Sequence, residues 1–391
     1  MGMAGPRRSL LIVTSRGAMS DGFVGKPSKG DCRMKALRYY IDVVGGCNLR
    51  CPSCPSGNSS EQPHSRGVMA SERFEMIVEK IYSESGPDSH ISLYNWGEPL
   101  LHPELGKLIG IANKHGYFPS LSTNLNHARP LQECLTGISS LRISLSGFFQ
   151  DTYAKAHVNG NVEQVRQNMQ KLRNIMDRNH LPINVHVAYH CYAYNLGVDY
   201  DQMKRFCKEL GFMFFPFWPH LMPIEKALAC YKGAASADEL SLADSFPVPL
   251  KDAIATALRY CPRDCPARET VTGINSDGSV PLCCGVYDSA LNIADDFLST
   301  PHQELQRRKA AHPFCRSCMD CGLHVIGQEV CFRQWNRIAA GRLGLRKLPK
   351  ELVRYGLFYA LLHQAEAVLG QSVMDQAVER LKRIVFRFSK R

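Results

Sequence analysis

The apolar residues of the first 220 positions alternate between two periods. Short apolar runs typical of buried strands lie at residues 39–44, 91–95, 118–124, 141–147, 183–189 and 212–218. Between them, windows such as 71–85 and 162–179 carry apolar residues at helical spacing. This alternation predicts βαβ units and a parallel sheet, closed or open, with an active site at the carboxyl ends of its strands.

Three cysteines follow the first predicted strand in the stretch Cys47-Asn-Leu-Arg-Cys51-Pro-Ser-Cys54. Gly45-Gly46 ends the strand, so the cysteines lie on a loop that leaves a strand end. Three thiolates so close together can reach one metal centre. Zinc would need a fourth protein ligand, whereas an iron–sulfur cubane held by three cysteines keeps one iron open. A structural zinc loop therefore stays open as an alternative.

Further polar motifs stand at the ends of later predicted strands. Trp96-Gly-Glu-Pro99 ends the second strand and Thr123-Asn124 ends the third, while Ser144 and Ser146 lie on the fourth. Each piece alone is compatible with an ordinary turn. Together, in this order and each at a strand end, they point to one site.

The C-x3-C-x2-C spacing, the WGEP turn and the TN element resemble the radical S-adenosylmethionine (SAM) enzymes over most of residues 37–225. The resemblance implies a partial (β/α)6 TIM-like barrel. It also implies a [4Fe–4S] cluster held by Cys47, Cys51 and Cys54, whose open iron binds SAM.

The same resemblance implies the contacts of SAM with the protein. Glu98 would accept the SAM amino group from a GGEP-like turn in which Trp96 replaces the first glycine. Ser144 and Ser146 lie where relatives contact the ribose or the substrate, although relatives often carry Asp at the position of Ser146. The implied cofactor-binding residues are Gly97, Glu98, Thr123, Asn124 and Ser144.

Cysteines return after an Ala- and Ser-rich segment. Asp277-Gly278 between alternating apolar residues is a hairpin signal, and this hairpin would bring Cys265 and Cys283 to the same end. A Cys-x2-Cys pair follows a predicted helix near residues 303–310. A zinc ribbon is one interpretation of these cysteines.

The order C-x12-G-x4-C followed by C-x2-C resembles the SPASM or twitch domains appended to many radical SAM enzymes. This implies one auxiliary [4Fe–4S] cluster on Cys265, Cys283, Cys315 and Cys318. The alternative is a second auxiliary cluster, with ligands among Cys261, Cys284, Cys321 and Cys331. The other cysteines, expected to be plain buried residues, are Cys32, Cys134, Cys191, Cys207 and Cys230.

The predicted domains are a poorly structured N-terminal segment (1–36), a radical SAM core (37–230), a linker with one or two short helices (231–258), a SPASM/twitch domain (259–333) and a basic helical tail (334–391). The net charge is +11, and residues 341–391 hold eleven Lys and Arg against four Asp and Glu. Because the remaining charge is nearly balanced, we expect no nucleic-acid partner. The tail is expected to pack on the barrel, with a surface contact to an acidic peptide, a phosphorylated substrate or a membrane face as the alternative.

Neither a signal peptide nor an apolar run of about 18 residues is found, so we expect a cytoplasmic location and no transmembrane segment. The resemblance implies that the reduced cluster splits SAM into methionine and a 5′-deoxyadenosyl radical, which abstracts a hydrogen atom from the substrate. A ribosomally synthesised peptide is the favoured substrate. The alternative is dehydrogenation or epimerisation of a sugar, aminocyclitol or other small natural-product intermediate. Flavodoxin or ferredoxin would be the reducing partner, and a non-catalytic iron–sulfur or zinc scaffold is the remaining alternative.

Overall fold

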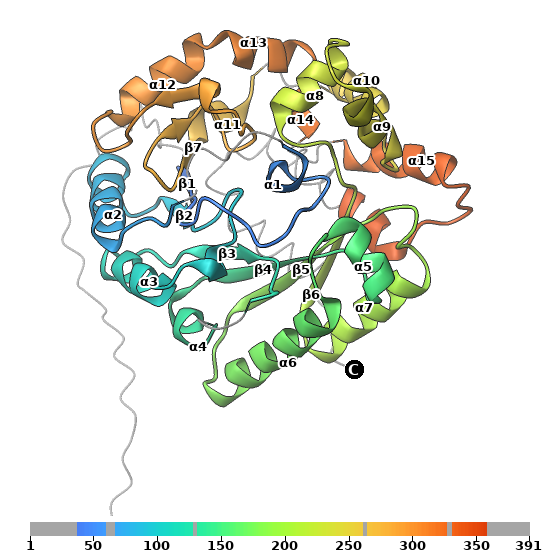
Figure 1. Cartoon of the computed structure of the whole chain (residues 1–391), viewed down its shortest axis with the longest axis horizontal. Helices are drawn as coiled ribbons and strands as arrows, with labels where there is room; N and C mark the ends of the chain where they lie inside the picture. The colour runs from blue at the N-terminus through green and yellow to red at the C-terminus, as the bar shows by residue number, and fades with distance from the viewer. Residues whose placement is uncertain (1–36, 60–66, 128–130, 261–263, 327–330, 358–391) are drawn as a thin grey trace, which may run out of the picture. The chain divides into compact units, whose positions relative to one another are not determined.

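Seven parallel strands form the sheet on which the molecule is built (Figure 1). The computed structural model describes residues 37–59, 67–127, 131–260, 264–326 and 331–357. The strand order is β6-β5-β4-β3-β2-β1-β7, and every pairing is parallel. The strands are β1 (Arg38–Ile41), β2 (His90–Ser92), β3 (Ser120–Thr123), β4 (Ser140–Leu145), β5 (Asn184–His190), β6 (Met213–Phe217) and β7 (Val271–Ile274). The predicted α/β fold is thereby confirmed.

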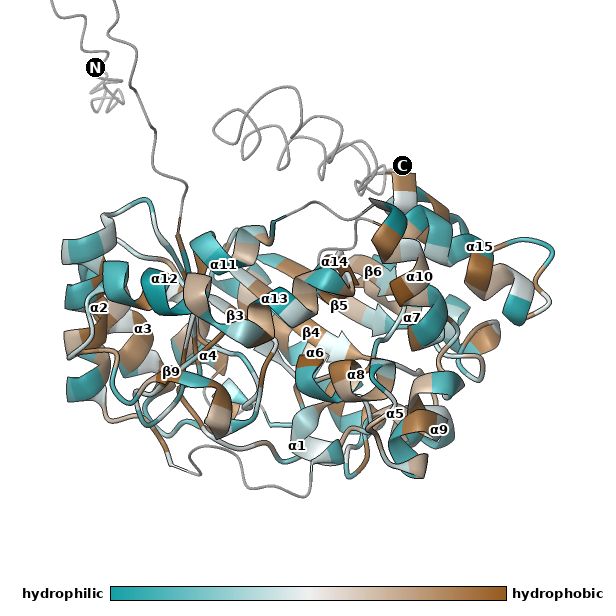
Figure 2. Cartoon of the chain, turned by 90° about the horizontal axis from the view of Figure 1, so that it is seen from above, coloured by the Kyte–Doolittle hydropathy of each residue, from teal (hydrophilic) through white to brown (hydrophobic). Residues whose placement is uncertain are grey.

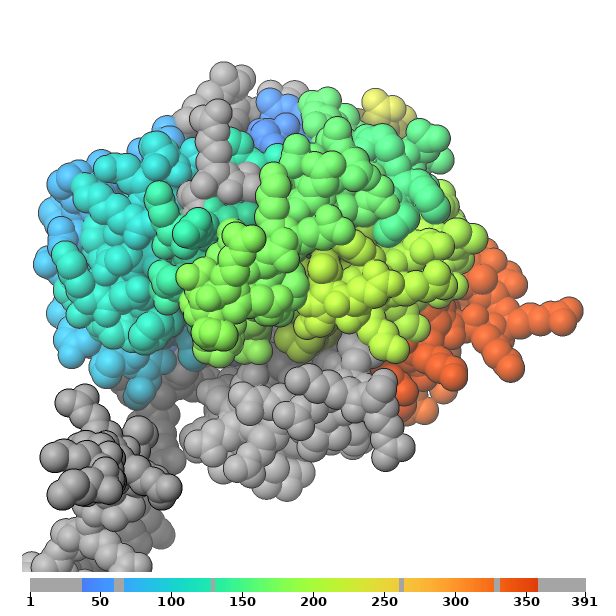
Figure 3. Space-filling model, turned by 90° about the horizontal axis from the view of Figure 1, so that it is seen from below, coloured from blue at the N-terminus to red at the C-terminus, as the bar shows by residue number. Residues whose placement is uncertain are grey.

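Helices connect successive strands and cover the outer face of the sheet. Their apolar residues face the strands; in α6, for example, Val165, Met169 and Leu172 are fully buried. The connecting elements are α1 (Pro55–Asn58), α2 (Ser71–Ser85), η1 (Pro99–Leu101), α3 (Leu105–Lys114), α4 (Leu131–Cys134), η2 (Leu135–Gly137), α5 (Gln150–Ala156), α6 (Val162–Arg178) and α7 (Val198–Glu209). Seen from below, the outer surface runs from cyan through green to yellow-green in the order of the chain (Figure 3).

The C-terminal part begins after β6 with three helices and then returns to the sheet. Its elements are α8 (Ile224–Tyr231), α9 (Ala237–Ser245), α10 (Leu250–Tyr260), α11 (Pro266–Thr270), β8 (Val280–Pro281), η3 (Ser289–Leu291), β9 (Asn292–Ala294), α12 (His302–Ala311), α13 (Pro313–Asp320), α14 (Leu323–Ile326) and α15 (Phe332–Arg342). The segment predicted as a linker, 231–258, thus holds α9 and most of α10. None of the described helices is long and apolar enough to cross a membrane.

The predicted hairpin around Asp277-Gly278 is wrong in its strand pairing, although the turn itself is present. The Gly278 amide donates to the Asn275 carbonyl at 2.8 Å, and Gly278 has a φ of +88°, which favours glycine. The two arms of the turn then separate, because β7 pairs with β1 while β8 pairs antiparallel with β9. Every residue of β7 is buried, as expected for a strand added to a covered parallel sheet.

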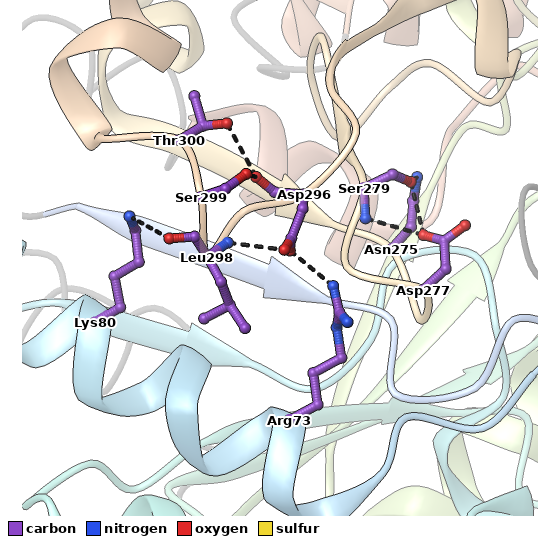
Figure 4. A network of polar contacts seen from close by, with 9 residues as sticks. All are labelled: Arg73, Lys80, Asn275, Asp277, Ser279, Asp296, Leu298, Ser299 and Thr300. Carbon is purple, nitrogen blue, oxygen red and sulfur yellow. Dashed lines mark hydrogen bonds and ion pairs between the residues drawn. The ribbon is translucent and has the colours of Figure 1, made fainter.

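A polar network fixes the loop after β9, residues 296–300, to helix α2 (Figure 4). Arg73 of α2 pairs with Asp296 at 2.7 Å, and the Lys80 ammonium donates to the Leu298 carbonyl at 3.2 Å. The Arg73–Asp296 pair is about one-third exposed on both sides, so it orients the contact more than it stabilises it. Figure 2 shows polar residues on the outside of α2 and α12 and apolar residues along the sheet.

The described part of the predicted tail packs on the barrel. The Trp218 indole N–H, just after β6, donates to the side-chain oxygen of Asn336 in α15 at 2.9 Å. Asn336 in turn donates to the Leu352 carbonyl at 2.8 Å, and Lys204 of α7 pairs with Glu351 at 2.6 Å. Residues 1–36 and 358–391, which include the predicted N-terminal segment and most of the basic tail, lie outside the described residues.

Candidate active site

A cavity of about 510 Å³ opens at the carboxyl ends of the strands, where the predicted site residues gather. Its lining includes Cys47, Cys51, Cys54, Gly97, Glu98, Thr123, Asn124, Ser144 and Ser146. All five predicted cofactor-binding residues and the three loop cysteines therefore face one space. The opposite wall comes from residues after β6 and from α14 and α15.

The cysteine loop is held by local backbone bonds. The Cys54 amide donates to the Cys51 carbonyl at 3.1 Å, and α1 starts directly afterwards with Pro55 at its first turn. A side chain at position 57 would approach the Cys51 carbonyl oxygen to 2.3 Å, so only glycine fits there. The sequence Cys-Pro-Ser-Gly thereby bends the loop back on itself and turns Cys54 toward the cavity.

The three thiols have the chemistry of metal ligands. The Leu49 amide (3.4 Å) and the Asn124 side-chain amide (3.6 Å) both donate to Cys47 Sγ, as they would to a thiolate. Burial raises the pKa of the Cys47 thiol to about 12, and burial together with Cys54 and Cys47 raises that of Cys51. Deprotonation in this site thus needs a metal to replace the proton.

Among the described residues, no three His, Cys, Asp or Glu side chains converge on a single metal ion. A cubane places each thiolate on a different iron and does not require that convergence. Three partly buried sulfurs on one loop, one of them accepting two N–H groups, fit such a cluster.

Asp42 organises the WGEP turn, and the sequence analysis missed it. Its carboxylate accepts the backbone amides of Asn95 (2.8 Å), Trp96 (3.0 Å) and Gly97 (3.0 Å). Burial raises the pKa of Asp42 to about 6, against the opposite effect of these three amides. A side chain at position 97 would lie 1.8 Å from the Val44 carbonyl oxygen, which explains the glycine. An acidic residue at the end of an apolar strand was the signal available in the sequence.

Glu98 lies at the centre of the predicted cofactor residues. Its carboxylate accepts from the Thr123 hydroxyl (2.7 Å), the Asn124 amide (2.7 Å) and the Leu100 amide (3.0 Å). The side chain is 3% exposed, and burial raises its pKa to about 7. Asn124 joins the two halves of the site, because its side chain also donates to Cys47 Sγ and to Asn48.

Two histidines that the sequence analysis did not single out connect the cysteine loop to the cavity. Nδ1 of His157 lies 3.6 Å from Cys51 Sγ, and its Nε2 lies 3.0 Å from the Ser146 hydroxyl. The same hydroxyl lies 3.0 Å from Nδ1 of His190. His157 is buried and stacks on Tyr153 at 4.7 Å, and burial lowers its pKa to about 4.

The far wall of the cavity is mostly apolar. It includes Phe217, Trp218, Leu221, Leu323, Ile326, Phe332 and Trp335. His220 is the polar residue of this wall, and its ring lies 4.7 Å from that of Trp335. Burial lowers the pKa of His220 to about 4, so the ring is neutral near pH 7.

Trp96 explains how the WGEP turn departs from a GGEP sequence. Its indole N–H donates to the Val286 carbonyl at 3.0 Å, and its ring meets that of Tyr287 edge to face at 6.2 Å. Both partners belong to the C-terminal part of the chain. The tryptophan therefore links the WGEP turn to the segment that carries Cys283.

The four cysteines predicted for an auxiliary cluster come from three separate elements. Cys265 precedes α11, Cys283 follows β8, and Cys315 and Cys318 lie in α13. Burial raises the thiol pKa of Cys283, and the neighbouring Cys284, Cys318 and Cys315 raise it further. Cys265 and Cys315 likewise raise the pKa of Cys318. The fold thus brings all four thiols into one neighbourhood.

The remaining cysteines divide into two groups. Cys284 and Cys321 adjoin the four predicted ligands, since each influences the pKa of a member of that set. Cys331 is fully buried at the start of α15, and Cys261 lies outside the described residues. Of those expected to be plain buried residues, Cys134, Cys191 and Cys207 are buried, Cys230 is partly exposed, and Cys32 lies outside the described residues.

A buried cation lies beside the C-terminal cysteines. Lys309 of α12 is 0% exposed, and its ammonium donates to the Val271 carbonyl (2.7 Å) and the Thr272 hydroxyl (3.1 Å). Burial lowers its pKa to about 8, while Cys283, Cys284 and Cys315, as thiolates, act in the opposite direction. Within the described part of the chain it forms no salt bridge with a carboxylate.

Comparison with known proteins identifies the central part of the chain. Residues 41–187 match the family model described as "Radical SAM superfamily". The chain is 24% identical over 190 residues to dTDP-4-amino-4,6-dideoxy-D-glucose ammonia-lyase of Streptomyces venezuelae, a match that covers 47% of this chain and 37% of that enzyme. It is 25% identical over 209 residues to a "Probable GTP 3',8-cyclase" of Methanococcus maripaludis, covering 49% and 65%.

Among solved structures, a histidine-tagged form of anSMEcpe with bound AdoMet aligns with a TM-score of 0.50 at 16% identity, over 88% of this chain and 98% of that one. This likeness concerns the fold. The matches to the two curated relatives span between about one-third and two-thirds of their lengths.

Proposed function

Since the chain belongs to the Radical SAM superfamily through residues 41–187, we propose that its cavity binds SAM, cleaves it reductively and removes a hydrogen atom from a small polar substrate. One observation carries this proposal. The Glu98 carboxylate and the three loop thiols face the same cavity, and Asn124 contacts both. One bound molecule could then place its amino group on the Glu98 carboxylate and its own carboxylate on a metal held by the loop thiols.

Each residue of the site has a separate task in this proposal. Cys47, Cys51 and Cys54 hold the cluster, which supplies an electron to SAM when bound. Glu98 accepts the SAM ammonium in a charge-assisted bond, and the amides that it already accepts hold its carboxylate in place. Asp42 fixes the turn that carries Glu98. The apolar far wall excludes water and stray hydrogen donors from the reacting groups.

The size of the cavity favours a small molecule over the peptide that the sequence alone favoured. Its 510 Å³ lies within the range of ordinary small-ligand pockets, and SAM must share it with the substrate. Side chains of α14 and α15 close the side opposite the cysteine loop. Both curated relatives carry names that refer to nucleotides or nucleotide sugars. We therefore favour a nucleotide, sugar or aminocyclitol substrate.

The C-terminal cysteines support a second metal group in this proposal. Cys265, Cys283, Cys315 and Cys318 would hold one auxiliary [4Fe–4S] cluster, since four thiols in one neighbourhood, one buried and three partly buried, can supply all its ligands. Cys284 and Cys321 are the candidates for further ligands. An external reductant such as flavodoxin or ferredoxin would supply electrons to the chain.

The first experiment is direct. Protein reconstituted with iron and sulfide, reduced with dithionite and given SAM should form 5′-deoxyadenosine, detected by mass spectrometry. Oxidised protein is the matched control, and no product from reduced, cluster-loaded protein would contradict the proposal.

The substrate class is then tested by stimulation of this reaction. A panel of nucleotide sugars and aminocyclitols is compared with a pool of short peptides, and the rate of 5′-deoxyadenosine formation above background is measured. Stimulation by peptides alone would restore the peptide hypothesis.

A further inference from the structure

A path of hydrogen bonds leads from Cys51 through His157 and Ser146 to His190. Which atom donates in each bond of this path follows from the chemistry of its side chains. We propose that iron binding at Cys51 fixes His190 as a hydrogen-bond acceptor in the cavity, where Nε2 receives a hydroxyl or amine N–H of the substrate. This inference rests on the proposed function, because it needs the cluster on the cysteine loop. It adds a substrate-positioning residue that no motif of the chain indicates.

The first link sets the direction. A cysteine bound to iron has no proton and can only accept a hydrogen bond. His157 Nδ1, 3.6 Å from Cys51 Sγ, must then carry a proton and donate it to the sulfur. His157 is 4% exposed and contacts no carboxylate among the described residues, and burial of the ring disfavours its charged form. Its other nitrogen, Nε2, is therefore an acceptor.

The second link passes this direction on. The buried Ser146 hydroxyl has one proton, and it lies 3.0 Å from both His157 Nε2 and His190 Nδ1. Because His157 Nε2 is an acceptor, the hydroxyl must donate to it. Toward His190 the oxygen can then only accept, so His190 Nδ1 carries a proton. In a neutral ring Nε2 then carries no proton and can accept a hydrogen bond.

The surroundings of His190 show what this bare nitrogen can meet. His190 lines the cavity, and Nε2 has no hydrogen-bond partner in the described part of the structure. Its ring packs on that of Phe217 with centroids 4.3 Å apart. Arg142, which also lines the cavity, is close enough to act on the charge of His190. An acceptor beside a guanidinium donor suits a substrate that carries hydroxyl or amine groups.

Without metal the direction is not fixed. The Cys51 thiol can then donate to His157, every bond of the chain can reverse, and His190 Nε2 can become a donor. The same cavity would thus present different hydrogen-bonding groups before and after cluster loading.

The test reads the tautomer of His190 directly. The full chain is labelled with 15N in its histidine rings, loaded with iron and sulfide, kept oxidised, and examined by 15N–1H correlation spectra. His190→Gln assigns the His190 signals. We expect Nδ1–H with a bare Nε2 in the loaded protein, and a mixture of both tautomers in the metal-free protein and in loaded Ser146→Ala. His157→Phe, which retains a ring on Tyr153, breaks the path at the preceding link and should give the same mixture.

His220 is the matched control, because it lines the same cavity without a link to Cys51. Its signals should not respond to metal or to either substitution. An Nε2–H on His190 in the loaded wild type, or an unchanged tautomer in both variants, would overturn the inference.

Two further measurements separate the causes of failure. The SAM dissociation constant of His190→Ala should stay within about threefold of the wild type, because the acceptor serves the second substrate. A larger increase would indicate that His190 Nε2 contacts the ribose hydroxyls of SAM, and would overturn the inference. Iron counting on the same samples shows whether the cysteine loop holds iron, which is the premise of this inference. A chain that keeps no iron on the cysteine loop fails the proposed function itself, whereas a loaded chain with the wrong tautomer fails this inference alone.

Discussion

The two cysteine regions of the molecule are built on different principles. Cys47, Cys51 and Cys54 lie within eight residues of one loop, and neutral N–H groups of Leu49 and Asn124 serve the first of these sulfurs. The C-terminal set is spread from Cys265 to Cys318, comes from separate elements and has a buried lysine beside it. The loop cysteines line the cavity, whereas none of the four C-terminal cysteines does.

This difference suggests a division of tasks. An open site with neutral donors leaves room for an exchangeable ligand such as SAM. The proposed auxiliary cluster, with four thiolate ligands, would have no such room, and the buried cation would offset its negative charge. An isolated buried ammonium is costly, and charged thiolates near Lys309 would reduce that cost.

The largest effect should come from removing the loop cysteines. Replacement of Cys47, Cys51 and Cys54 together by Ala should remove about four of roughly eight irons and abolish 5′-deoxyadenosine formation, because the ligands of the open cluster are lost. Iron analysis and product detection measure the two effects. Full SAM cleavage by this variant would contradict the assignment of the loop.

Removal of the C-terminal thiols should give the complementary loss. In Cys315→Ala/Cys318→Ala, about four irons should be lost while those of the loop remain, because the two sites share no ligand. The remaining cluster should still show a SAM-dependent change in its EPR spectrum. Cys331→Ala is the control and should keep all iron. A wild-type count near twelve that falls in Cys321→Ala would instead indicate two auxiliary clusters.

Glu98→Gln should act on the open site alone. Loss of a charge-assisted bond to an ammonium costs about 1.5–3 kcal/mol, so the SAM dissociation constant should rise about 10- to 150-fold. Titration calorimetry on loaded protein measures this constant. The iron content should not change, and an unaltered affinity would exclude Glu98 as the amino-group partner.

Lys309→Met should act on the closed site alone. Loss of one cation near the thiols disfavours the reduced, more negative cluster, so the reduction potential should become more negative. The potential is measured by EPR-monitored titration in the Cys47/Cys51/Cys54 triple variant, which isolates the auxiliary signal. Lys80→Met on α2 is the control, and Lys309→Arg should restore much of the potential.

SAM binding should also depend on pH through Glu98. Burial raises its pKa to about 7, and only the ionised carboxylate attracts the SAM ammonium. Affinity should be full above pH 7 and fall by up to about tenfold for each unit below it, because binding must then release a proton. Dissociation constants between pH 6 and 8 test this. The slope should disappear in Glu98→Gln, and a slope that persists there would assign the dependence to another group.

The elements and the local motifs could be predicted from the sequence. Apolar periodicity located all six strands β1 to β6 to within a few residues, because each pattern is read within one element. The three loop cysteines, Glu98 and Thr123-Asn124 were identifiable for a related reason. Each lies at the end of a parallel strand, and such ends meet at one edge of the sheet.

Which distant residues meet became known from the tertiary structure alone. The Asp277-Gly278 turn was visible in the sequence, but whether β7 pairs with β8 or with β1 depends on an edge of the sheet formed more than 200 residues earlier. The three amides accepted by Asp42 and the contact of Trp96 with Val286 are likewise long-range. Local propensity carries no information on these partners, since they are chosen by packing and burial of the whole chain. For the same reason the path from Cys51 to His190, and the burial of Lys309, became apparent only in three dimensions.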